Sequence, residues 1–147
     1  MRPIKFRVKG RNNQWHYGYP LIYNDESFSF VDYEKLNDDR TPLELCTLEY
    51  IEYDTLGEFT GLCDKNGKKI YEGDIIKSHY GSIYIVKYLP DWCSFSLKLV
   101  FLNTEGKLSR ATGRQHLYKN DCTRLEILGN IWDDPDLLGG SDEECDN

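Results

Sequence analysis

Residues 59–76 read FTGLCDKNGKKIYEGDII and place two turn signals around a short apolar pair. Asn66-Gly67, preceded by Asp64, offers backbone that tolerates positive φ, which a tight hairpin turn requires. One strand should therefore enter this turn and another should leave it. Glu72-Gly73-Asp74 then interrupts the chain before Ile75-Ile76, a pattern typical of a bend that leads into a buried strand. The stretch predicts architecture and carries no recognisable chemistry.

This block resembles the signature of the YopX family, whose members are small proteins encoded largely by phages and prophages. Three further segments resemble landmarks of that family in the expected order: Ile4–Arg7, Asp54–Gly57 and Leu125–Leu138. Residues 24–45 and 82–121 are not diagnostic. The family has no assigned biochemical function and no agreed catalytic residues. The resemblance therefore implies a context, a phage-related, cytoplasmic and mainly β protein, and it implies no site.

Alternation of apolar and basic residues opens the chain. Residues 4–8 have the period of a strand with one solvated side, and the turn at residues 10–14 predicts a hairpin whose second strand is ended or kinked at Pro20. The core side of the first strand would carry Ile4, Phe6 and Val8, the solvated side Lys5, Arg7 and Lys9, and one face of the second strand Trp15, Tyr17 and Tyr19.

Successive short strands with frequent turns predict a small barrel or sandwich. Further strands are expected at residues 28–31, 48–51, 75–79, 83–88, 93–102 and 124–131. Residues 33–40 are expected to form a loop with room for one helical turn, and Pro135–Leu138 to form a helical turn. We therefore expect a mainly β fold, with an SH3-like barrel over residues 58–132 and an N-terminal β region over residues 1–57. The N-terminal hairpin would either complete the barrel or form a second sheet. The N-terminal region and the barrel region would together belong to one domain over residues 1–138.

The net charge of −7 is concentrated at one end of the chain. Seven of the twenty-five acidic residues lie within residues 133–147, and the other eighteen match the eighteen lysines and arginines. Residues 139–147 contain small and acidic side chains that cannot bury enough apolar area to order themselves, so we expect a disordered tail. The neutral body lacks the broad positive field that drives non-specific binding to nucleic acid.

The cellular compartment of the protein is inferred from the lengths of its apolar stretches and from its cysteines. No stretch approaches the roughly twenty apolar residues of a membrane helix, and the first residues do not form a signal peptide, so we expect a cytoplasmic protein. The five cysteines are odd in number and scattered, which predicts neither a disulfide framework nor a zinc site. Cys63 and Cys93 have apolar neighbours and are expected to be small core residues.

Catalytic candidates are few. His16, His79 or His116 would have to pair with Cys93 or Cys122, but no local motif of a hydrolase accompanies them. A solvated position is the simpler prediction for His16. The acidic residues around the signature block are more simply explained as side chains that hydrogen-bond the backbone of turns than as catalytic groups. We therefore propose no catalytic, cofactor-binding or metal-binding residue. The acids concerned are Asp54, Glu58, Asp64, Glu72 and Asp74.

Binding is the function class that remains. A basic strand beside aromatic residues is able to hold single-stranded nucleic acid, which makes Lys5, Arg7, Lys9 and Arg11 candidate contacts. The simpler interpretation is that the aromatic residues pack in the core and the basic residues form a solvated face. We therefore expect a non-enzymatic accessory protein that binds a protein or self-assembles, with nucleic-acid binding as the alternative and no cofactor.

Removal of residues 139–147 should leave folding intact, because these residues are small or acidic and offer no large apolar side chain to dock on the body. The melting temperatures of the full chain and of the truncated chain measure this directly. A drop of many degrees on truncation would show that the tail is part of the folded structure.

Overall fold

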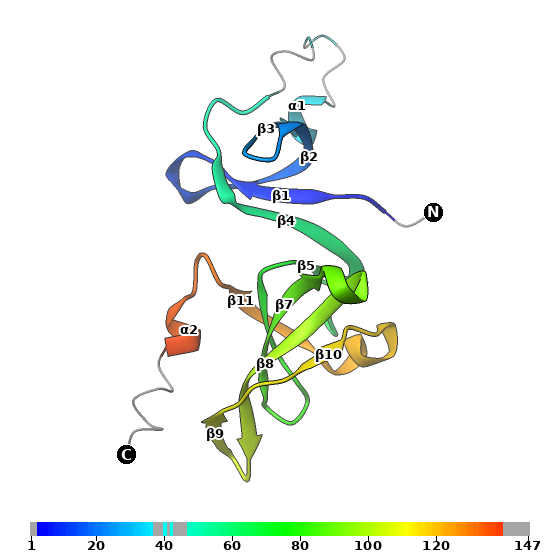
Figure 1. Ribbon diagram of the computed structural model, residues 1–147, viewed down its shortest axis with the longest axis vertical. Helices are drawn as coiled ribbons and strands as arrows, with labels where there is room; N and C mark the ends of the chain where they lie inside the picture. The colour runs from blue at the N-terminus through cyan, green and yellow to red at the C-terminus, as the bar shows by residue number, and fades with distance from the viewer. Residues whose placement is uncertain (1–2, 37–39, 41, 43–46, 140–147) are drawn as a thin grey trace. The chain divides into compact units, whose positions relative to one another are not determined.

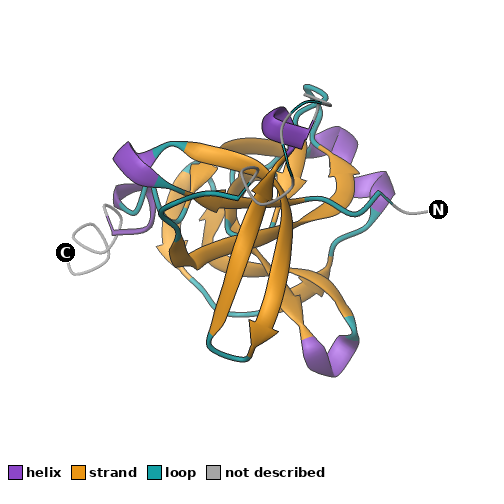
Figure 2. Ribbon diagram, turned by 90° about the horizontal axis from the view of Figure 1, so that it is seen from above, coloured by secondary structure: helices purple, strands orange, loops and turns teal. Residues whose placement is uncertain are grey.

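The computed structural model describes residues 3–36, 40, 42 and 47–139 (Figure 1). Of the predicted tail, residues 139–147, only Gly139 lies within the described residues. Strands predominate over helices, which confirms the mainly β fold (Figure 2). The chain divides into two compact units, residues 1–59 and residues 60–147. The strand β4 begins in the first unit and ends in the second.

Unit 1 is an antiparallel sheet in the order β3-β2-β1-β4. The predicted hairpin is present as β1 and β2, but Pro20 neither ends nor breaks β2. It lies beyond Gly18, the last residue of β2 that pairs with β1, where the missing N–H of proline is tolerated. The elements of unit 1 are β1 (Phe6–Lys9), η1 (Arg11–Asn13), β2 (Trp15–Asn24), β3 (Ser27–Asp32), α1 (Tyr33–Leu36) and the start of β4 (Glu52–Cys63).

One segment of unit 1 differs from the sequence prediction. A strand was expected at residues 48–51 and a connecting segment at residues 52–57, whereas the strand β4 starts at Glu52. Pairing with β1 explains the difference, because Phe6 and Arg7 lie opposite Glu58 and Gly57. This tertiary pairing overrides the polar composition of the segment. The loop predicted after β3 begins with the helical turn α1, and residues 37–39 of that loop lie outside the described residues.

Unit 2 contains a six-stranded antiparallel sheet, in which five strands follow the order β10-β8-β7-β6-β11 and the sixth, β9, pairs with β8. The end of β4 pairs separately with β5. The pairings of the described strands form open paths and do not close into a ring. Residues 107–121, whose sequence shows no clear strand or helix periodicity, contain two short strands and the start of a 3-10 helix. The elements are β5 (Lys69–Tyr71), β6 (Asp74–Lys77), β7 (Ile83–Leu89), η3 (Pro90–Trp92), β8 (Ser94–Thr104), β9 (Lys107–Arg110), β10 (Arg114–His116), η4 (Lys119–Arg124), β11 (Glu126–Asn130) and α2 (Asp136–Gly139).

The predicted hairpin turn between β4 and β5 is confirmed. Gly67 has φ +80°, and its N–H donates to the carbonyl oxygen of Asp64 at 3.0 Å. The buried carboxylate of Asp64 accepts the N–H groups of Asn66 and Lys68 at 2.9 Å each through Oδ1. Its Oδ2 accepts the N–H of Ile127 in β11 at 3.0 Å. One side chain therefore fixes the turn and fastens it to a strand sixty residues later in the sequence.

The second turn of the block has the same kind of role. The N–H of Gly73 donates to Val86 O in β7, and the carbonyl oxygen of Gly73 accepts the N–H of Ile131, both at 2.9 Å. The carboxylate of Asp74, which is 2% exposed, accepts the N–H of Tyr71 at 2.8 Å. Backbone hydrogen bonding is thus the observed role of both Asp64 and Asp74, as predicted.

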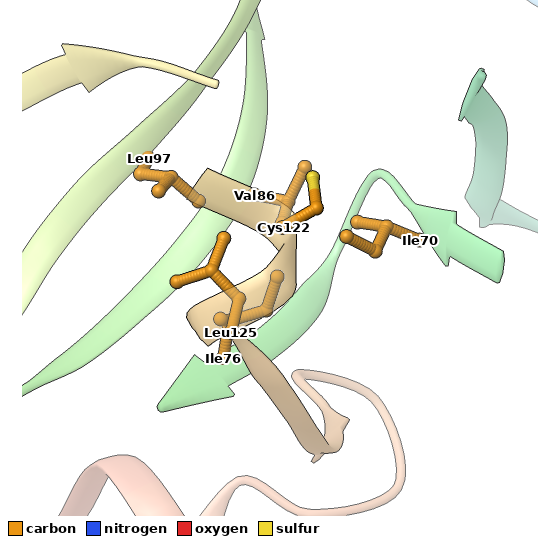
Figure 3. Packing of buried hydrophobic residues seen from close by; sticks show 6 residues of the cluster. All are labelled: Ile70, Ile76, Val86, Leu97, Cys122 and Leu125. Carbon is orange, nitrogen blue, oxygen red and sulfur yellow. The ribbon is translucent and has the colours of Figure 1, made fainter. Parts of the chain in front are cut away.

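The core of unit 2 forms between β5, β6, β7, β8 and the end of η4 (Figure 3). Cys122 belongs to this core, whereas Cys63 and Cys93 are exposed, so the prediction that these two are core residues was wrong. Cys63 is the last residue of β4, and Cys93 follows Pro90–Trp92 in a left-handed conformation with φ +50°. The buried side chains are Ile70, Ile76, Val86, Leu97, Cys122 and Leu125.

The expected C-terminal helical turn is present as α2. Leu138 packs against the smaller core cluster of Ile75, Ile83 and Phe101. Just before this helix, the Oδ2 of Asp134 accepts the N–H of Asn130 at 3.1 Å. Within the described ranges, no helix has the length and apolar character of a membrane span.

Gly67→Val should lower the free energy of unfolding by roughly 1–3 kcal/mol, because a β-branched side chain is strained at positive φ. No atom lies within 4 Å of the position that a Cβ would occupy, so strain and not a clash is the expected cause. Gly67→Asn is the matched control, since asparagine tolerates this conformation better. Equal urea midpoints for all three proteins would contradict the assigned turn.

Asp64→Ala should lower the free energy of unfolding by roughly 2–5 kcal/mol, because three backbone N–H groups lose their acceptor. Asp64→Asn keeps one acceptor oxygen and should lose less. Denaturant titration of the three proteins gives both differences. A loss below about 0.5 kcal/mol for the alanine variant would show that water replaces the carboxylate without cost.

Candidate functional site

The predicted basic face of β1 is not solvated. Arg7 and Lys9 are only 6% and 5% exposed, Lys5 is partly buried, and Arg11 alone is exposed. Arg7 lies directly opposite Tyr17, and Lys9 directly opposite Trp15. Directly paired residues project from the same face of an antiparallel sheet, so the basic and aromatic side chains share one face.

Cation–π contacts account for part of this arrangement. The guanidinium carbon of Arg7 and the ammonium nitrogen of Lys9 lie 4.6 Å and 5.6 Å from the centre of the Trp15 ring. The expectation that the aromatic side chains pack in the core was also wrong, because Tyr17 and Tyr19 are 42% and 41% exposed. The positions of the bases and of the tyrosines are therefore the reverse of the predicted ones.

An exposed apolar stripe runs along β2. Its members follow the two-residue period of the strand, and Tyr23 is placed on this face by its hydroxyl contact with Ser29 Oγ at 2.7 Å. Tyr19 also contacts the ring of Tyr33 edge to face, with 4.8 Å between centroids. We call these residues the β2 stripe: Tyr17, Tyr19, Leu21 and Tyr23, which are 42%, 41%, 41% and 67% exposed.

Two adjoining cavities of unit 2 form a groove. They have volumes of about 520 and 620 Å³ and share Ser78, His79, Tyr80 and Arg124 as lining residues. The first, the apolar half, is also lined by Tyr84, Leu102, Gln115, His116, Tyr118 and Leu125. The second, the basic half, is also lined by Lys65, Lys77, Thr123 and Glu126.

The turn between β6 and β7 forms one wall of the groove and is held by hydrogen bonds. The N–H of Ser78 donates to Ser82 O at 2.8 Å, and the N–H of Ser82 donates to Ser78 Oγ at 3.1 Å. The side-chain amide of Asn103 donates to Tyr80 O at 2.5 Å. The rings of His79 and Tyr80 contact each other edge to face at 5.3 Å. The groove therefore has a preorganised wall.

A row of rings lies along β10 and the residues after it. His116 stacks at 4.4 Å on Trp92 and lies 5.7 Å from Tyr118, and its Nδ1 is 3.0 Å from Ser94 Oγ. A serine close to a histidine is one part of a hydrolase triad, but Ser94 is the single hydrogen-bond partner of the His116 side chain among the described residues. The orienting acid of a triad is thus missing there.

Tyr84 lines the apolar half and packs against the main core. Burial raises the pKa of its hydroxyl, because the charged phenolate is poorly solvated. Tyr84 therefore stays neutral at physiological pH and offers the groove a hydrogen-bonding group rather than a charge.

The other predicted candidates are dispersed. His16 is partly buried and not fully solvated as predicted, because its Nδ1 lies 2.7 Å from Asp32 Oδ2 and its side chain is 21% exposed. The thiols of Cys93 and Cys122 donate to backbone carbonyl oxygens of Pro90 and Tyr118. No group of three potential metal ligands occurs among the side chains that the structure describes.

Sequence reasoning missed both surfaces for different reasons. The alternation of Tyr17, Tyr19, Leu21 and Tyr23 is visible in the sequence, but Pro20 was expected to end or kink the strand. The groove has no sequence signal, because its residues come from five separate segments between Lys65 and Glu126 that the fold brings together.

Comparisons with known proteins agree with this architecture. A model of the family described as YopX protein matches residues 5–139. No curated protein matches the chain. The crystal structure of protein EF1440 from Enterococcus faecalis is similar, with a TM-score of 0.55 and 18% sequence identity over 94% of this chain and 99% of that one. At this identity the likeness shows the fold alone. The family match spans nearly the whole chain, and the protein therefore belongs to the YopX family.

Proposed function

We propose that this YopX-family protein is a non-enzymatic module that self-associates through the β2 stripe. The observation that carries the proposal is a run of four exposed apolar side chains on one face of one strand. Monomeric proteins rarely expose large contiguous apolar patches, and tyrosine is among the residues enriched in protein interfaces. Each tyrosine buries a large ring while its hydroxyl keeps a hydrogen-bonding group at the rim.

A second copy of the same chain is the occupant that the charges favour. Arg11 is exposed just before β2, and Asp25 and Glu26 are exposed just after it. Two-fold symmetry is the commonest in homodimers, and two such stripes pack antiparallel when the two-fold axis is perpendicular to the strand. The basic end of one stripe then meets the acidic end of the other, which supports both the partner and the orientation.

The wider role in this proposal follows from the family. YopX proteins are encoded largely by phages and prophages, which supports an accessory role in the cytoplasm of a bacterial host. We further propose an SH3-like arrangement for unit 2. Its support is the meander of β6, β7 and β8 together with the β4–β5 hairpin that Asp64 fastens to β11.

Leu21→Glu should convert a concentration-dependent dimer into a monomer, because the variant buries a carboxylate in the apolar contact. Ile22→Glu is the matched control, since Ile22 is 72% exposed on the opposite face of the same strand. Sedimentation velocity over protein concentrations from about 1 to 500 µM measures the effect, a range that covers interfaces of moderate affinity. Circular dichroism confirms that each variant is folded.

Charge reversal tests the antiparallel orientation. Arg11→Glu and Glu26→Arg should each weaken the dimer, and the double variant should regain affinity, because the two charges then attract again. A wild-type chain that stays monomeric at the highest concentration would overturn the proposal. Equal loss of the dimer in the Leu21 and Ile22 variants would also overturn it.

A further inference from the structure

We infer that the groove of unit 2 binds single-stranded nucleic acid, with an unpaired base in its apolar half and backbone phosphates in its basic half. This site lies in unit 2 and the β2 stripe lies in unit 1, so the inference goes beyond the proposed self-association. It also differs in location from the basic strand that the sequence suggested, in which Arg7 and Lys9 are buried.

The basic half has more positive than negative charge. Lys65 Nζ lies 3.4 Å from Glu126 Oε2, and both side chains are well exposed. Lys77 lies opposite Glu126 in the pairing of β6 with β11, and Arg124 precedes that strand. Glu126 is the one acid among the described lining residues, so three cations share a single carboxylate. Within the described part of the chain, neither Lys77 nor Arg124 forms an ion pair. Two positive charges therefore remain for phosphates.

The apolar half offers ring faces for stacking. Tyr80 and Tyr118 are 73% and 58% exposed, which is high for side chains that line a cavity. Stacking on aromatic side chains holds bases with little sequence preference, because every base has a π face. A row of contacts orients Tyr118, since His116 is fixed between Trp92 and Ser94. The rings thus lie in place before a ligand arrives.

The combination of cations and rings favours a single strand over other polyanions. A duplex pairs and stacks its bases internally, so it presents phosphates to the basic half and nothing to the rings. An acidic protein segment would satisfy the cations but would have no general need of two exposed tyrosines. Because only about two phosphates are neutralised, affinity should fall gently with salt, with a logarithmic slope of about −1.4.

Fluorescence anisotropy of the full chain with labelled DNA and RNA oligonucleotides of about 15 nucleotides tests this inference. We expect binding to both single strands and at least about tenfold weaker binding to a duplex of the same sequence. Arg124→Glu should weaken single-strand binding at least about tenfold and flatten the salt slope. Tyr118→Ala should weaken it about fivefold or more while leaving the salt slope unchanged, because stacking releases no counterions.

Two matched controls separate the groove from general effects. Lys107→Glu reverses an exposed charge of unit 2 outside the groove, and Tyr50→Ala removes an exposed ring of unit 1. Neither should change the affinity for single strands. An absence of binding at about 50 mM salt would overturn the inference, as would equal losses in the Lys107 and Arg124 variants. Tighter binding to the duplex or to a polyglutamate competitor would also overturn it. The Leu21→Glu variant should bind nucleic acid normally, so the two proposals fail independently.

Discussion

The carboxylate of Asp64 is the contact on which the architecture of unit 2 depends. It accepts two N–H groups of its own turn and one from β11, so it links the start of the unit to its last strand. Gly73 makes a second link of this kind through Val86 and Ile131. Buried backbone groups require partners, and here the signature block supplies them to strands distant in the sequence. The block is thus a structural centre, and this role accounts for its turn-rich composition.

Unit 1 shows how strand pairing decides which side chains meet solvent. Arg7 and Lys9 pair with Tyr17 and Trp15, so bases and rings occupy one face, and the bases are buried there while the tyrosines stay exposed. Burial of the basic groups removes them from contact with phosphates and leaves an apolar stripe on the surface. In our proposals, unit 1 therefore provides a surface for protein contact, and the site for phosphates lies in unit 2.

The groove of unit 2 is built from turns and short segments attached to a stable sheet. The turn of residues 78–82, the row of rings near β10 and the end of η4 each have their own local hydrogen bonds or ring contacts. Rigid placement lowers the entropic cost of binding, because the side chains need not be ordered by the ligand. A site with ring faces and cations held in place suits recognition.

The sequence by itself determined the mainly β class, the hairpin turn at Gly67, the backbone role of Asp64 and Asp74, and the helical turn at α2. Each of these depends on local chemistry, a residue that tolerates positive φ or a short acid beside a turn, which neighbouring residues suffice to specify. Only the tertiary structure decided the extension of β2 through Pro20, the start of β4 at Glu52, the burial of Arg7 and Lys9, the exposure of Cys63 and Cys93, and the groove itself. These features depend on which strands lie side by side, and that pairing joins residues as far apart as Asp64 and Ile127, whose contact no local pattern encodes.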